Sequence, residues 1–119
     1  MSVLTSLDGR SLAAAWGRKD EVNVVDEVIR LAEIAVASGV DGLVCSGLEP
    51  ARVRERFGSA LELLVPGVRL AGGATQDQTR VVTPRQAREA GARYVVIGRA
   101  VTATADRAAA MRQVLDDLG

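Results

Sequence analysis

The chain has 119 residues, of which 48% are apolar, and its 15 basic and 15 acidic side chains cancel to a formal charge of zero. This composition excludes a disordered chain, and the neutral charge lacks the basic excess typical of nucleic-acid binding. No apolar run approaches the roughly 18–20 residues of a membrane span, so neither nucleic acid nor membrane is an expected partner. The length predicts one domain, residues 1–119.

Short β-rich runs alternate with helical patterns along the chain. In order, the predicted strands are Val3–Ser6, Gly42–Ser46, Leu61–Val65 and Arg93–Gly98. The last two are nearly continuous in apolar character, which is typical of parallel strands covered on both faces. Four strand–helix units in succession predict an α/β fold with parallel strands and right-handed crossovers.

The predicted helices follow the strands in turn. A short helix over Ser11–Trp16 is expected to pack Trp16 against the sheet. The next helix occupies the stretch from Asn23 to Ser38, with Asn23 as its cap and Gly39 as the left-handed residue beyond its end.

Two further helices follow the second and third strands. Pro50–Phe57 begins with a proline at its first position and ends before Gly58, and its basic side chains are interpreted as a solvated face. The segment after Thr83 carries a capping box with Gln86. A last helix begins near Asp106, with one apolar face formed by Ala110, Met111, Val114, Leu115 and Leu118.

Four parallel strands leave two architectures open. One is an open sheet with helices on its faces, and the other is half of an eight-stranded barrel. An arc of four strands cannot close on itself and leaves two bare strand edges. Pairing two copies edge to edge would remove both edges, so we expect a homodimer.

Ligands of α/β sheets and barrels bind beyond the carboxyl ends of the strands. There, Gly72-Gly73-Ala74 permits close backbone approach, and Gln78 and Arg80 add hydrogen-bond donors. Gly98 followed by Arg99 combines free amides with a guanidinium, which suits a phosphate oxyanion. The alternative is that the glycines form a flexible turn and that Arg99 makes a surface ion pair.

Other polar residues give weaker signals. Thr5 and Ser6 lie at the end of the first strand, where their hydroxyls either contact a ligand or cap the following turn. Cys45 lies inside an apolar run and is interpreted as an inert buried thiol. A single cysteine and no histidine exclude an intrachain disulfide, a zinc site or a Ser–His–Asp triad within one chain, so no metal is expected. One cysteine and no signal-peptide pattern predict a reducing, cytoplasmic setting.

Five segments, LTS, DGLVCS, LLVPGVR, GATQDQTRVVTPRQAREAGARYVVIGR and AVT, occur in this order. In this combination the chain resembles the carboxyl-terminal half of orotidine 5′-phosphate decarboxylase, from the first predicted strand to the last helix. The family fold is a (β/α)8 barrel, and the resemblance assigns the whole chain to its fifth to eighth βα units as a half-barrel domain. The family forms UMP, in pyrimidine biosynthesis, without a metal or an organic cofactor.

The resemblance also implies ligand contacts. Arg69, Gln78, Gly98 and Arg99 match positions that bind the phosphate and its surroundings, Thr5 matches a substrate-contacting threonine, and Ser6 would face the pyrimidine amide. The family's catalytic Asp-x-Lys-x-x-Asp motif is absent from the 119 residues. Lys19 is the only lysine, and it has Gly17 two residues before it and Val22 three residues after it. We therefore assign no catalytic residue and expect this chain alone to have little or no decarboxylase activity.

Three functions remain open at this point. The first is a homodimeric half-barrel that binds phosphate or a UMP-like nucleotide. The second is one part of a two-chain decarboxylase, in which a separate amino-terminal half-barrel supplies the catalytic lysine and aspartates. The third is a structural protein whose phosphate-binding residues are unused.

Overall fold

The computed structural model describes residues 2–3, 7–70 and 80–119. It contains a parallel sheet whose four strands follow one another in chain order. The strands are β1 (Ser2–Val3), β2 (Gly42–Cys45), β3 (Glu62–Val65) and β4 (Tyr94–Val95). The predicted parallel arrangement is confirmed, and β1 and β4 form the two edges.

The last strand, β4, is shorter than the predicted Arg93–Gly98. Between β3 and β4, Leu64 pairs with Tyr94. The pairing continues one residue past β4, because the amide of Val96 donates to the carbonyl oxygen of Val65. Gly98 does not belong to the strand, because it caps the helix that follows. Residues 4–6, the rest of the predicted first strand, lie outside the described part of the chain.

Six helices connect and flank the described strands, and local signals account for most of their ends. Asn23 accepts hydrogen bonds from the amides of Val25 and Asp26, and Thr83 forms the predicted capping box with Gln86. The helices are α1 (Gly9–Ala15), α2 (Val24–Ala37), α3 (Pro50–Phe57), α4 (Pro84–Glu89), α5 (Arg99–Thr102) and α6 (Arg107–Leu118).

Aliphatic side chains form the core between one face of the sheet and the helices. Leu43 and Cys45 of β2 and Leu63 of β3 are each at most 2% exposed. They pack against buried residues of α2 and α3, including Val28 and Val53. A second cluster joins Val65 and Val82 to Ala87 of α4. Alternate strand residues point to opposite faces, so the other face of the sheet presents a different set of side chains.

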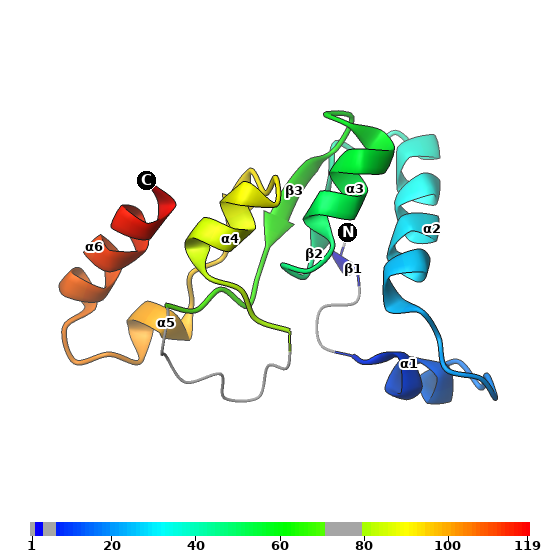
Figure 1. The fold of residues 1–119 in the computed structure, drawn as a ribbon, viewed down its shortest axis with the longest axis horizontal. Coiled ribbons are helices and arrows are strands. Elements are labelled where there is room, and N and C mark those ends of the chain that lie inside the picture. The colour runs from blue at the N-terminus through cyan, green and yellow to red at the C-terminus, as the bar shows by residue number, and fades with distance from the viewer. Residues whose placement is uncertain (1, 4–6, 71–79) are drawn as a thin grey trace.

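That second face is open at its β4 edge. Val95 and Ile97 pack toward α4, whereas the alternating residues Tyr94 and Val96 are 53% and 44% exposed. Figure 1 shows α2, α3, α4 and α6 in this order across the view, with α1 and α5 toward the end where β3 finishes, and α3 packs beside α2 and α6 beside α4.

The molecule is more open than a compact domain of its size. Its radius of gyration is 15.1 Å, whereas about 13.5 Å is expected for this length. Its accessible surface is 7010 Å², against about 6200 Å² for a monomer of this mass. This shape is that of an arc with one uncovered face.

Two sequence-based interpretations need correction, the packing of Trp16 and the placement of Arg54 on the solvated face of α3. Trp16 is 40% exposed, with the Arg18 guanidinium 5.2 Å from its ring centre, and does not pack into the sheet. Arg54 does not belong to a solvated face, because it donates to the carbonyl oxygens of Gly91, Gly58 and Leu61.

The apolar face predicted for α6 is only partly covered by the described chain. Only Ala110 and Val114 of its predicted apolar face are buried, while Met111 and Leu115 are 40% and 55% exposed.

Candidate functional site: the carboxyl edge of the sheet

Because the strands are parallel, their carboxyl ends meet at one edge. Arg69 follows β3 at this edge, and Gly98 and Arg99 follow the neighbouring strand β4. The fold therefore places three of the predicted phosphate-binding residues after two adjacent strands. In a (β/α) barrel, this edge carries the ligand site.

Arg69 is buried, with only 8% of its surface exposed. Its amide donates to the carbonyl oxygen of Val82 at 3.0 Å, and its Nη1 donates to the carbonyl oxygen of Val68 at 2.9 Å. Its Nε is buried and has no hydrogen-bond partner within the described ranges. An acceptor brought by a ligand would satisfy this donor.

Gly98 and Arg99 form the start of α5, a short helix that the sequence analysis did not predict. Gly98 is the N-cap, and its carbonyl oxygen accepts hydrogen bonds from Val101 and Thr102 at 2.9 and 3.1 Å. Arg99 is the first helical residue, and its side chain is exposed.

A buried ion pair at the same edge is the feature that the sequence analysis missed. Glu49, the residue before α3, is completely buried and pairs with Arg80, whose side chain is 11% exposed. Burial lowers the pKa of the Arg80 guanidinium. The available signal was an acidic residue at a helix start four positions after an apolar strand, but its partner lies 31 residues away.

The remaining predicted site residues are not placed. Thr5, Ser6, Gln78 and the segment Gly72-Gly73-Ala74 lie outside the described residues. Asp8, an acidic residue near the end of the first predicted strand, caps α1: its Oδ1 accepts from the amide of Ser11 at 2.7 Å, and this hydrogen bond lowers the pKa of the carboxyl group.

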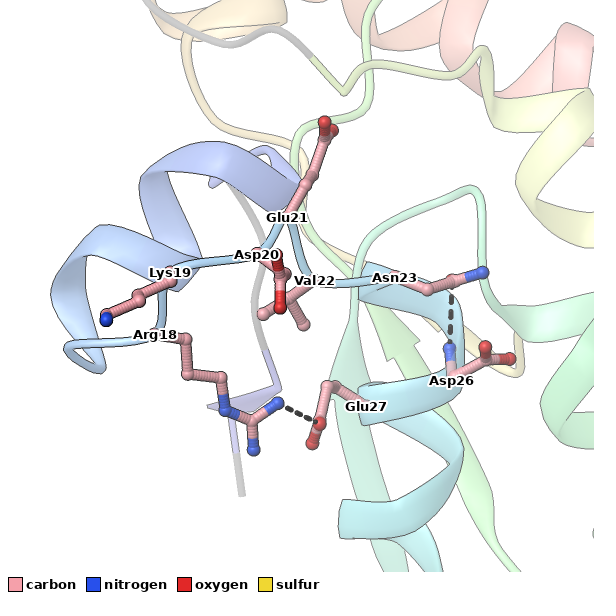
Figure 2. Close-up of a pocket in the computed structure, with 8 residues that line it drawn as sticks. All are labelled: Arg18, Lys19, Asp20, Glu21, Val22, Asn23, Asp26 and Glu27. Atoms are coloured by element: carbon pink, nitrogen blue, oxygen red, sulfur yellow. Dashed lines mark hydrogen bonds and ion pairs between the residues drawn. The ribbon is translucent and has the colours of Figure 1, made fainter.

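A surface depression of about 600 Å³ lies along the connection between α1 and α2. Figure 2 shows the residues that line it. Arg18 and Glu27, which line it, form an ion pair at 2.9 Å, and Lys19, another of its lining residues, is exposed. The pKa of Glu27 is lowered mainly by the hydrogen bond from Arg30 and also by that from Arg18. These charges support the connection between the two helices, and the depression does not include the residues that follow β3 and β4.

The cysteine, the metal-ligating residue types and the helix lengths can each be compared with the sequence. Cys45 is completely buried, and burial raises the pKa of its thiol to about 11, as expected of an inert thiol. Among residues 2–3, 7–70 and 80–119, no cluster of His, Cys, Asp or Glu has the size to hold a metal ion. Within the same ranges, no helix has the length and apolar character needed to cross a membrane.

Comparison with known proteins decides the family. The family described as "Orotidine 5'-phosphate decarboxylase / HUMPS family" matches residues 1–114. The chain belongs to this family. It is 41% identical over 120 residues to orotidine 5′-phosphate decarboxylase of Gluconobacter oxydans, covering 99% of this chain and 49% of that protein. It is 48% identical over 106 residues to the enzyme of Alcanivorax borkumensis, covering 86% of this chain and 43% of that protein.

A solved structure agrees with the family resemblance. The crystal structure of orotidine 5′-phosphate decarboxylase from Lactobacillus acidophilus superposes with a TM-score of 0.74 at 27% identity, covering 99% of this chain and 48% of that one. The chain thus spans about half the length of the orotidine 5′-phosphate decarboxylases that it matches.

Proposed function

We propose that this chain is the phosphate- and nucleotide-binding half of an orotidine 5′-phosphate decarboxylase barrel, and that a second copy of the chain completes the barrel. The ligand is the 5′-phosphate of a pyrimidine nucleotide such as UMP. In this proposal Arg69, Gln78, Gly98 and Arg99 hold the phosphate group and its surroundings, and Thr5 and Ser6 contact the rest of the nucleotide.

One observation carries the binding proposal: the buried Arg69 has an Nε with no hydrogen-bond partner in the described part of the chain. A buried donor without an acceptor costs free energy. A phosphate oxygen would satisfy it and gain a charge-assisted hydrogen bond. Arg99 and the start of α5 follow the adjacent strand and add positive charge at the same edge.

The proposal assigns binding, and not catalysis, to this chain. Decarboxylation requires groups that stabilise the negative charge developing on the ring and a positioned proton donor. Lys19 is exposed, so it is not preorganised for either role. Binding that is equal in the ground state and the transition state lowers KM without raising kcat.

The second copy is supported by the surface that the arc leaves open. The accessible surface of 7010 Å² is larger than the about 6200 Å² expected of a compact monomer of this mass. Apolar side chains lie exposed at β4 and on the two outermost helices: Tyr94, Val96, Ile34, Val36, Met111 and Leu115. A two-fold axis along the barrel would pair β1 of each copy with β4 of the other.

A separate amino-terminal half-barrel is the second candidate, favoured by the half-length match to the relatives. It would cover the same surface and would supply the catalytic lysine and aspartates. The two candidates predict different native masses for the purified chain in solution, because only the first predicts that the chain pairs with itself.

Calorimetry with inorganic phosphate and with UMP tests the binding site. Arg99→Ala is expected to weaken binding of both by about tenfold or more, because it removes a charge-assisted donor beside amides that remain. Arg52→Ala serves as a control, because Arg52 is exposed on α3 and pairs with Glu55. Equal affinities in the wild type and Arg99→Ala would refute the site.

A further inference from the structure

The turn between β2 and α3 holds a completely buried carboxylate. Glu49 precedes Pro50 at the start of α3, and both of its side-chain oxygens are shielded from solvent. Its charge is compensated by the ion pair with Arg80, the first described residue after 71–79. A buried pair of this kind is weak evidence for stability, because desolvation of the two charges offsets much of their attraction. A role other than stability therefore has to be considered.

The segment that begins with Arg80 is fixed to two strand ends. On the β3 side, Val82 forms a parallel bridge with Val68 and accepts the hydrogen bond from the Arg69 amide at 3.0 Å. On the β2 side, the turn residue Gly47 packs so closely on Val82 that a β-carbon there would overlap the Val82 side chain. The Glu49–Arg80 ion pair is a second contact between this segment and the turn after β2.

These contacts link Glu49 to the proposed phosphate site through the backbone. Glu49 holds Arg80, and Val82, two residues further on, holds the amide of Arg69. The donor Nε of Arg69 is buried at this point. A small displacement of this segment would therefore move the residue that is proposed to receive the phosphate.

We propose that Glu49 is a positioning residue: by pairing with Arg80 at the end of β2 it fixes the 80–82 segment, and thereby the orientation of Arg69 toward a phosphate group. This inference rests on the proposed function for its ligand. It runs against simple electrostatics, because removing a negative charge near an anion site would by itself tighten anion binding. Loss of positioning would weaken phosphate binding, whereas loss of the negative charge would tighten it, so the sign of the change in affinity tests the inference.

The test compares phosphate affinity among variants by calorimetry. Glu49→Gln is expected to bind inorganic phosphate at least about tenfold more weakly than the wild type, by analogy with the loss when residues that orient metal ligands are removed. Glu55→Gln is the matched control: it makes the same change in charge at an exposed site on α3, and its affinity should equal that of the wild type. Wild-type or tighter binding by Glu49→Gln would overturn the inference.

A double variant separates positioning from stability. Replacing both partners, Glu49→Leu with Arg80→Met, removes the pair at constant net charge and leaves no unpaired buried ion, a change that proteins often tolerate. The double variant is expected to stay folded and to remain weak in phosphate binding. Wild-type affinity in this variant would contradict the positioning role even if Glu49→Gln fails to fold.

Hydrogen exchange supplies a readout that needs no ligand. The Arg69 amide, bonded to Val82, should exchange at least about tenfold faster in the double variant, while the Arg93 amide, bonded to Leu63 in the sheet, should not change. Unchanged exchange at Arg69 would overturn the inference. A wild-type chain that binds no phosphate would instead refute the proposed function, and the exchange result would still decide the positioning role.

Discussion

The residues at the carboxyl edge differ in what their burial implies. Cys45 is buried among aliphatic side chains, and burial raises the pKa of its thiol to about 11. Arg69 is buried with an Nε that has no hydrogen-bond partner in the described chain, and Glu49 is buried in an ion pair with Arg80. A buried thiol needs no partner, whereas a buried guanidinium or carboxylate does. The charged residues are therefore the ones for which burial indicates a function.

The Cys45 thiol predicts how stability depends on alkaline pH. Its pKa is about 11 in the folded chain against 9.0 for the ordinary thiol. Below pH 9 both states keep the proton. Above pH 9 the unfolded state loses it first, so the free energy of unfolding should fall by about 1.4 kcal/mol per pH unit up to about pH 11.

Urea unfolding of the wild type and Cys45→Ala at several pH values measures this contribution. The variant lacks the thiol, so the difference between the two slopes isolates it from other groups that titrate in the same range. Parallel slopes between pH 9 and 11 would show that the thiol ionises equally in both states.

At the scale of elements, α3 shows how one helix divides its charged residues. Arg52 pairs with Glu55 on the exposed side. Arg54, two residues further on, donates to the backbone carbonyl oxygens of Leu61, before β3, and of Gly91, before β4. It therefore ties α3 to the amino ends of the two neighbouring strands.

We expect Arg54→Ala to lower the free energy of unfolding by about 1–3 kcal/mol, because it leaves partly buried carbonyl oxygens without their donor. Arg52→Ala, the same substitution on the same helix, should change it by no more than about 0.5 kcal/mol. Urea denaturation at neutral pH compares them. Similar losses in both variants would argue against a specific role for Arg54.

The elements also show what could be predicted from the sequence. The caps at Asn23 and Thr83 depend on residues two or three positions apart, so local patterns were sufficient for them. The hydrogen bond from Arg54 to Gly91 spans 37 residues, and no local pattern indicates it.

In the candidate site, too, some features could be predicted from the sequence and others could not. The positions of Arg69 and Arg99 after strands β3 and β4 could be predicted, because parallel strands bring their carboxyl ends together. The Glu49–Arg80 pair could not, because it forms only when the 80–82 segment packs against the turn after β2. Thr5, Ser6 and Gln78 lie outside the described residues, and their roles stay predictions.

At the scale of the whole molecule, the chain is an arc with exposed apolar surface. Its relatives are about twice its length, and the outermost helices α2 and α6 expose Ile34 and Leu115 at 52% and 55%. The predicted apolar face of α6 is only partly covered by this chain. Burying several hundred Å² of such surface is worth on the order of 10 kcal/mol before the costs of association. We therefore expect two copies of the chain to associate.

The native mass measured by light scattering on the purified chain at micromolar concentration tests this central claim most directly. We predict a dimer of about 25 kDa, twice the chain mass of 12.5 kDa. A stable monomer of 12.5 kDa that remains soluble at this concentration would contradict it, because the open face of the sheet would then need no second copy.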